Sequence, residues 1–90
     1  MKFRKIPTVV EAVQLPIVRT EAPTWVLRAI DANNIYLFEG GAGVRTRDGT
    51  NVVAKDGDWI VQGVYGELYP VTNKVMLLDY APITKENERG

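Results

Sequence analysis

The chain has 90 residues, enough for a single domain with one modest hydrophobic core. Its hydrophobic fraction of 46% and charged fraction of 24% are those of an ordinary globular domain and exclude a disordered or fibrous chain. The 11 basic and 11 acidic residues cancel, so no strong overall field attracts nucleic acid, an anionic membrane or a cationic partner.

Three residue types that carry much of enzyme chemistry, histidine, cysteine and serine, are absent from the sequence. Their absence excludes imidazole bases, thiolate or serine nucleophiles, and metal sites built from histidine or cysteine. We therefore expect a protein that is not an enzyme and carries no cofactor. A chain without disulfides favours the reducing cytoplasm, and no apolar run is long enough to span a bilayer.

The first predicted element is a strand at residues 8–15, where β-branched residues predominate between Pro7 and Pro16. The more apolar of its faces, which we expect to point into the core, carries Val9, Glu11, Val13 and Leu15. A carboxylate on a buried face must be paired or protonated. Glu11 is therefore either an interior ligand-binding or catalytic acid, or a residue that is paired with a nearby cation or placed at the sheet margin.

An amphipathic helix is predicted from Pro23 to Ala32, because proline suits the first turn of a helix and an apolar stripe follows it. The stripe consists of Trp25, Val26, Ala29 and Ile30. Asn33 and Asn34 end the helix, since asparagine tolerates the left-handed conformation common at helix ends. A short strand at residues 35–38 and a flexible glycine-rich break at residues 39–43 come next.

Two hairpins are predicted in the second half of the chain. In the first, residues 44–47 and 51–54 flank Asp48-Gly49, a pair that favours a type I′ turn, and residues 55–58 form another turn. In the second, residues 59–62 and 67–70 flank a turn at 63–66. A symmetric turn places Trp59, Val61 and Leu68 on the core face and gives the other face Ile60, Gln62, Glu67 and Tyr69.

The predicted fold class is α+β: a small antiparallel sheet of two hairpins plus the N-terminal strand, one helix packed on a face, and a short C-terminal element. Residues 73–80, after the candidate N-cap Thr72, fit either a helix or a last strand. One globular domain is expected at residues 1–84 and a polar tail at 85–90. The expected core consists of Val9, Val13, Trp25, Val26, Ile30, Leu37, Val53, Trp59, Val61 and Leu68.

Two patterns resemble ligand sites, but a turn or a loop explains each of them more simply. Asp56-Gly57-Asp58 brings two carboxylates together, but it lacks the spacing and the terminal glutamate of a calcium loop, so a turn without metal is predicted. The glycines at 40, 41 and 43 do not form a GxGxxG motif and are followed by a strand, so a flexible loop is predicted rather than a phosphate site.

Two surfaces are candidates for recognition. The first is a basic patch for nucleic acid, for which the candidate residues are Lys2, Arg4, Lys5, Arg45, Arg47 and Lys55. A net charge of zero argues against nucleic-acid binding and favours an ordinary solvated face for these residues. Tyrosines are favoured contact residues at interfaces, so the second hairpin offers the better surface, with Gln62, Tyr65, Glu67 and Tyr69. The alternative for Tyr69 is that it only packs across from Ile60.

Two segments resemble those of a group of small phage and prophage proteins. The segments are Lys5-Ile6-Pro7 with Val9-Val10-Glu11-Ala12-Val13-Gln14, and Asp56-Gly57-Asp58-Trp59-Ile60-Val61-Gln62-Gly63-Val64-Tyr65-Gly66-Glu67-Leu68-Tyr69-Pro70. In the group they read KP-x-x-VEA-x-Q and PGDW-I-x-x-G-x-x-GE-x-YP; Ile6 and Asp56 depart from them. The resemblance covers most of residues 4–80 and implies a phage or prophage product in bacterial cytoplasm, with no assigned activity, cofactor or catalytic residue.

Three functions remain open at this point. The first is a protein-binding accessory or host-modulating factor that works through the second hairpin or a strand edge. The second is a structural or assembly component that acts as a homo-oligomer. The third is a ligand-binding protein or enzyme that uses Glu11 with a tyrosine, which would require a concave pocket lined by both.

Overall fold

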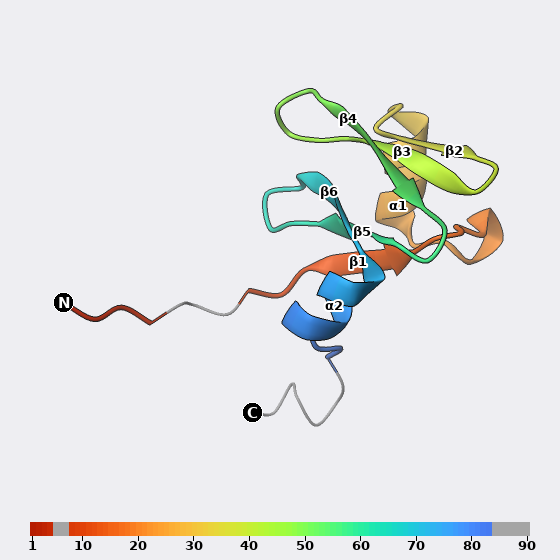
Figure 1. The fold of residues 1–90 in the computed structure, drawn as a ribbon. Coiled ribbons are helices and arrows are strands. Elements are labelled where there is room, and N and C mark those ends of the chain that lie inside the picture. The colour runs from red at the N-terminus through yellow and green to blue at the C-terminus, as the bar shows by residue number, and fades with distance from the viewer. Residues whose placement is uncertain (5–7, 84–90) are drawn as a thin grey trace.

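Within residues 1–4 and 8–83, which a computed structural model describes, the chain forms two three-stranded antiparallel sheets and two α-helices (Figure 1). Sheet A has the order β1-β5-β6 and consists of β1 (Glu11–Gln14), β5 (Trp59–Gln62) and β6 (Leu68–Val71). Sheet B has the order β2-β3-β4 and consists of β2 (Ile35–Phe38), β3 (Gly41–Arg45) and β4 (Asn51–Lys55). The helices are α1 (Thr24–Asp31) and α2 (Asn73–Asp79), and a 3-10 turn, η1 (Arg19–Glu21), precedes α1. The predicted α+β class is confirmed.

The main core lies between the two sheets and beneath α1. Ile60 of sheet A, Ile35 of sheet B and Val26 of α1 are all but completely buried there. The other buried members of the cluster are Leu15, Ala29, Ala42, Val44, Ala54 and Leu68. Because burial of apolar surface is the main favourable term in folding, this cluster holds the sheets and α1 together.

The opposite face of sheet A is covered in part by α2, which lies beside it in Figure 1. The indole Nε1 of Trp59 donates a hydrogen bond of 3.0 Å to Oδ1 of Asn73, which ties β5 to the first residue of α2. Thr72 is the N-cap, and its Oγ1 accepts a hydrogen bond of 3.3 Å from the backbone N–H of Val75. The segment 73–80 that sequence patterns left open is therefore helical over Asn73–Asp79.

Helix α1 begins and ends as predicted. Pro23 is its N-cap, and Asn33 has a left-handed backbone with φ of 61° just after the helix. The apolar stripe packs inward, with Val26 and Ala29 buried and Trp25 and Ile30 partly buried against the core. The capping residues and the apolar stripe mark the same segment as helical. This element can therefore be predicted well from the sequence.

The predicted glycine break at residues 39–43 is wrong, because Gly41 begins strand β3. Only Glu39 and Gly40 form the turn, with Phe38 paired with Gly41 across it. The β3–β4 hairpin is present, but its loop is longer than a type I′ turn. Arg45 pairs with Asn51, and of Asp48 and Gly49 only the glycine has a positive φ, of 86°.

The predicted pairing of the second hairpin is off by one residue. Gln62 pairs with Leu68 and Val61 pairs with Tyr69, so the loop holds five residues, 63–67. Relative to β5, a shift of one residue exchanges the two faces of β6. Leu68 therefore shares the main-core face with Ile60 and Gln62. The prediction that Trp59 and Val61 lie on this face is wrong, because they share the α2 face with Tyr69.

Two residues that were expected in the core are exposed instead. Val9 precedes β1 and is 68% exposed, and Val53 faces outward from sheet B and is 64% exposed. The predicted tail at 85–90, residue 84 and residues 5–7 lie outside the described residues. No helix in the described part of the chain is both long and apolar enough to cross a membrane.

Candidate functional site

The β5–β6 loop is held by its own hydrogen bonds. The backbone N–H of Gly63 donates to the carbonyl of Glu67 at 2.8 Å, and that of Gly66 donates to the carbonyl of Gly63 at 3.0 Å. The Glu67 carboxylate accepts from the backbone N–H of Tyr65 at 3.3 Å and lies so close to Gly63 that a Cβ there would overlap it. The loop is therefore closed on itself and presents Tyr65, which is 81% exposed.

The β3–β4 loop approaches this tyrosine from sheet B. The guanidinium carbon of Arg47 lies 5.9 Å from the centre of the Tyr65 ring, within the range of a cation–π contact. Asp48 organises the loop: it accepts hydrogen bonds from the Thr46 hydroxyl and the backbone N–H of Thr50. These bonds, that from Thr46 first, lower the pKa of the Asp48 carboxyl from its ordinary value.

Two adjoining cavities open beside the β5–β6 loop. The first, of about 320 Å³, lies between the two loops and is lined by Asn34, Arg45, Thr46, Arg47, Tyr65, Gly66, Glu67 and Leu68. The second, of about 540 Å³, lies along α1 and is lined by Thr24, Trp25, Arg28, Ala29, Ala32, Asn34, Gln62, Gly66 and Leu68. Because the cavities share Asn34, Gly66 and Leu68, we treat them as one surface, the arginine groove.

The charge of the arginine groove is predominantly positive. Among the described residues, Arg28, Arg45 and Arg47 line it and Glu67 is the one acidic residue that does. None of these arginines forms an ion pair with an acidic residue in the described part of the chain. Guanidinium groups without a carboxylate partner are available to an anionic group from another molecule.

The groove also contains a polar group without a partner. Nε1 of Trp25 is buried and has no hydrogen-bond acceptor among the described residues. An unsatisfied buried donor costs about 1–3 kcal/mol. Trp25 is also a lining residue of the second cavity, so a ligand bound there would lie beside this indole.

Three of the four residues predicted for the recognition surface meet at this groove. Tyr65 and Glu67 line the first cavity and Gln62 lines the second. Tyr69 does not join them, because the shifted register of β6 turns it toward the α2 face. Burial, followed by a hydrogen bond with Tyr80, raises the pKa of Tyr69 to about 12.

Of the alternatives for Glu11, the place at the sheet margin is the one observed, and the interior carboxylate is not. Glu11 pairs with Gln62 and shares the face of Val13, but it lies at the end of β1, beyond the core, and is exposed. It lines neither cavity of the groove. A carboxylate in water needs no partner, so burial gives no reason to assign Glu11 a catalytic or ligand-binding role.

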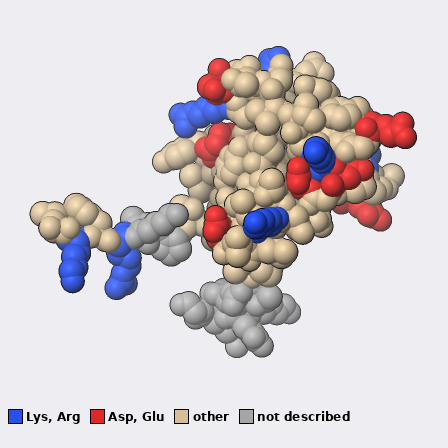
Figure 2. All heavy atoms as spheres, in the orientation of Figure 1, with Lys and Arg blue, Asp and Glu red and all other residues tan. Residues whose placement is uncertain are grey.

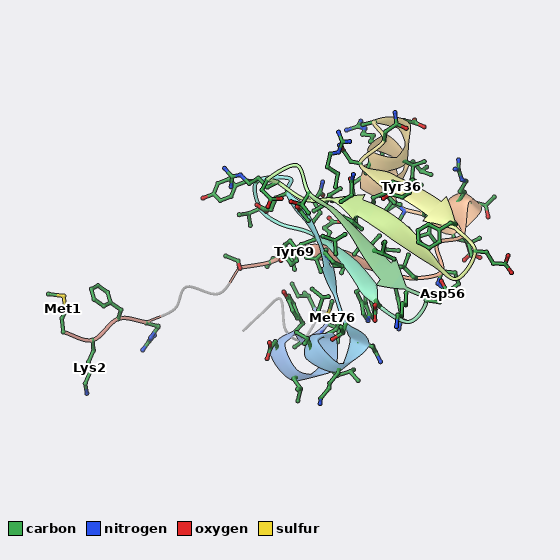
Figure 3. All side chains as sticks on the ribbon, turned by 45° about the horizontal axis from the view of Figure 1, so that its top comes forward. Met1, Lys2, Tyr36, Asp56, Tyr69 and Met76 are labelled. Carbon is green, nitrogen blue, oxygen red and sulfur yellow. The ribbon has the colours of Figure 1, made fainter. Side chains whose placement is uncertain are left out.

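The basic residues that were considered as a patch do not form one surface. Figure 3 shows Lys2 on the N-terminal segment, which extends away from both sheets, whereas Arg45 belongs to β3 and Lys55 to β4. Lys5 lies outside the described residues. On the face shown in Figure 2, Lys and Arg side chains are interspersed with Asp and Glu, without a broad field of one sign.

Arg28 and Trp25 are groove residues that sequence patterns did not identify as functional. Arg28 falls on the polar side of α1 and Trp25 within its apolar stripe, and both features are ordinary for an amphipathic helix. Only the packing of α1 beside the β5–β6 loop brings them to the groove. No signal in the sequence links residues 25 and 28 to residues 45 and 47.

No metal centre or known relative identifies the chain. Among the described residues, no three Asp or Glu side chains come together as metal ligands would, and Oδ2 of Asp58 accepts a hydrogen bond of 3.1 Å from the backbone N–H of Lys55. Comparisons with protein-family models, curated proteins and solved structures give no match to this chain. Its function must therefore be argued from the groove.

The raised pKa of Tyr69 predicts a loss of stability at alkaline pH. Between the ordinary pKa of 10.0 and the folded-state value of about 12, the unfolded chain releases the phenol proton while the folded chain retains it. Stability from this group is therefore fully present below about pH 10 and is lost as the pH rises through the folded-state pKa. Because Tyr69 is partly exposed, the slope should lie well below the limit of about 1.4 kcal/mol per pH unit.

Urea unfolding of the wild type and of Tyr69→Phe at about pH 8 and about pH 11 measures this effect. Phenylalanine has no proton to release, so the variant should lose less stability than the wild type between the two pH values. Equal losses in the two proteins would show that Tyr69 does not titrate differently in the folded and unfolded states.

Proposed function

We propose that the chain is a protein-binding accessory or host-modulating factor that uses the arginine groove and the β5–β6 loop. The observation that carries the proposal is the groove itself. Arginines without an ion-pair partner among the described residues, an exposed tyrosine and a tryptophan line its adjoining cavities. Tyrosine, tryptophan and arginine are the residues most enriched at the energetic centres of protein interfaces.

The proposal includes an origin and a compartment. The resemblance of residues 9–14 and 56–71 to segments of phage and prophage proteins supports a phage-encoded product that acts in bacterial cytoplasm. The proposal assigns no catalytic step and no cofactor to the chain, in keeping with a sequence that lacks histidine, cysteine and serine.

A photo-crosslinking amino acid at position 65 tests the proposal. Tyr65 is highly exposed at the rim of the groove, so the reactive group should capture a bound protein in a bacterial lysate. The matched control is the same substitution at Leu77, an exposed residue of α2 that lines neither cavity. We expect one discrete adduct at position 65 and none at position 77, and the absence of any adduct at position 65 would refute groove binding.

Self-assembly is a second candidate, favoured by the outer face of sheet B. Tyr36, Phe38 and Val53 are exposed on this face, and the two rings lie 6.4 Å apart between centroids. An exposed apolar patch marks many interfaces. Light scattering of the purified chain and of Val53→Lys tests this candidate, which requires an oligomer for the wild type and a monomer for the variant.

A further inference from the structure

We infer that the partner of the arginine groove presents an extended peptide segment with carboxylate groups on both sides of a short uncharged stretch. This inference rests on the proposed function and adds the chemistry of the partner. Three features of the groove carry it: a positive group of side chains in each cavity, and an uncharged surface between them.

The first cavity offers two guanidinium groups to one end of the peptide. Arg45 ends β3 and Arg47 follows in the β3–β4 loop, where its guanidinium carbon lies 5.9 Å from the centre of the Tyr65 ring. A cation–π contact leaves the N–H groups of a guanidinium free to donate hydrogen bonds to a carboxylate. Glu67 does not neutralise the pair, because no ion pair joins it to either arginine and its carboxylate is bonded within its own loop.

The second cavity offers a different positive group to the other end. Arg28 lines it together with Thr24, the first residue of α1. The first turn of α1 has no acidic residue, and its N-cap Pro23 makes no side-chain hydrogen bond, so the partial positive charge of the helix N-terminus is not offset there. The guanidinium of Arg28 and the helix terminus therefore act on the same cavity.

The surface between the two positive groups is uncharged. Leu68, Gly66 and Asn34 line both cavities, and Ala29 and Ala32 continue the wall along α1. A peptide backbone that crosses this surface brings carbonyl groups to the wall that contains Trp25. Binding there would change the surroundings of the Trp25 indole, which lines this cavity, and the Nε1–H resonance reports that change.

Charge spacing favours a peptide over single-stranded nucleic acid. A nucleic acid carries a phosphate at every residue and would bring negative charge to the uncharged middle and to Glu67, in a chain with a net charge of zero. A peptide carries carboxylates only where its sequence places them. Its charges can therefore match the two ends of the groove and leave the middle neutral.

Synthetic peptides with defined charges test the inference. One peptide has glutamates at both ends of an alanine and glycine stretch, two have glutamine at one end, and one has glutamine at both. Each is titrated into the full ¹⁵N-labelled chain at low salt, with the affinity and the indole N–H resonance of Trp25 as readouts. We expect each glutamate to tighten binding about tenfold relative to the glutamine in its place, since one charge-assisted hydrogen bond contributes that much. The two-glutamate peptide should also shift the Trp25 resonance.

Variants of the chain assign each peptide carboxylate to its cavity. In the double variant Arg45→Gln and Arg47→Gln, the glutamate at one end of the peptide should no longer bind more tightly than glutamine. In Arg28→Gln, the same should hold for the glutamate at the other end. Arg19→Gln, in η1 and outside the groove, is the control and should bind like the wild type. The ¹⁵N spectrum of each free variant verifies that it is folded.

The outcomes separate the inference from the proposed function. If the glutamine peptide binds as tightly as the glutamate peptide, or if no peptide binds while position 65 still crosslinks to a protein, the inference is wrong and the proposed function stands. If oligothymidine displaces the peptides and binds more tightly, the partner is nucleic acid and the inference is wrong. If position 65 crosslinks to nothing, the proposed function itself is wrong.

Discussion

Replacement of Ile60 by alanine is expected to lower the free energy of unfolding by about 2–5 kcal/mol. Ile60 has no exposed surface and lies in the centre of β5, where it faces sheet B and α1. The substitution removes apolar contacts and leaves a cavity that strands on both sides prevent from closing. Since small domains have total stabilities of about 5–15 kcal/mol, this is a large share of the whole.

Urea unfolding followed by tryptophan fluorescence measures the change, because Trp25 and Trp59 lie in different parts of the fold. Val53→Ala is the matched control: it also shortens a β-branched strand residue, but Val53 is mostly exposed, so its cost should stay within about 0.5 kcal/mol. Similar costs for the two variants would contradict the arrangement of core and surface described above.

The elements that could be predicted from sequence are those with local signals. Helix α1 has a proline at its start, an asparagine suited to a left-handed backbone at its end, and an apolar stripe between them. Each signal acts within a few residues, so no knowledge of the rest of the fold is needed. Strand β2 and the turn at 55–58 were predicted for the same reason.

The register of the β5–β6 hairpin could not be predicted, because it depends on the length of its loop. A turn of four residues and one of five fit the glycines at 63 and 66 equally well. The choice is made by side chains, since Leu68 completes the main core only in the observed register, in which Glu67 closes the loop over Gly63. The same shift decides that Tyr69 leaves the predicted recognition surface.

The arginine groove could be predicted only in part. The hairpin tyrosine and its neighbours are adjacent in sequence, so a shared surface at Gln62, Tyr65 and Glu67 was within reach. The arginines come from a helix and from the other sheet, and their meeting depends on how the two sheets pack. Long-range packing of this kind has no local sequence signal.

The glycines of β3 show how a tertiary contact overrides a local preference. Glycine weakens a strand because it has no side chain to pack. Here the neighbouring strand supplies the missing surface: Tyr36 lies over Gly43, and Phe38 lies over Gly41, with its Cε2 atom 3.3 Å from where a Cβ of Gly41 would be. The aromatic rings of β2 therefore let residues 41–43 form a strand where a flexible loop was predicted.

Gly41→Ala is therefore expected to destabilise the fold by about 1–3 kcal/mol or more. A Cβ at this position would overlap the backbone carbonyl of Ala54 in β4 and press against Phe38. A backbone atom in the centre of a paired strand cannot move aside without breaking the β3–β4 ladder. The cost arises from overpacking and not from backbone strain, since Gly41 has no positive φ.

Gly43→Ala separates the two kinds of contact. The three atoms nearest to a Cβ at Gly43 all belong to the far end of the Tyr36 side chain, which is exposed and can rotate away. Its cost in stability should therefore be clearly smaller than that of Gly41→Ala. When Gly43→Ala is combined with Tyr36→Ala, the overlap is removed, and Gly43→Ala should add even less to the cost of Tyr36→Ala. Thermal unfolding of the single and double variants orders these costs. If Gly43→Ala were more destabilising than Gly41→Ala, this explanation would be wrong. The packing of the Tyr36 ring on Gly43, and not the contact of β4 with Gly41, would then be the reason that β3 contains glycine.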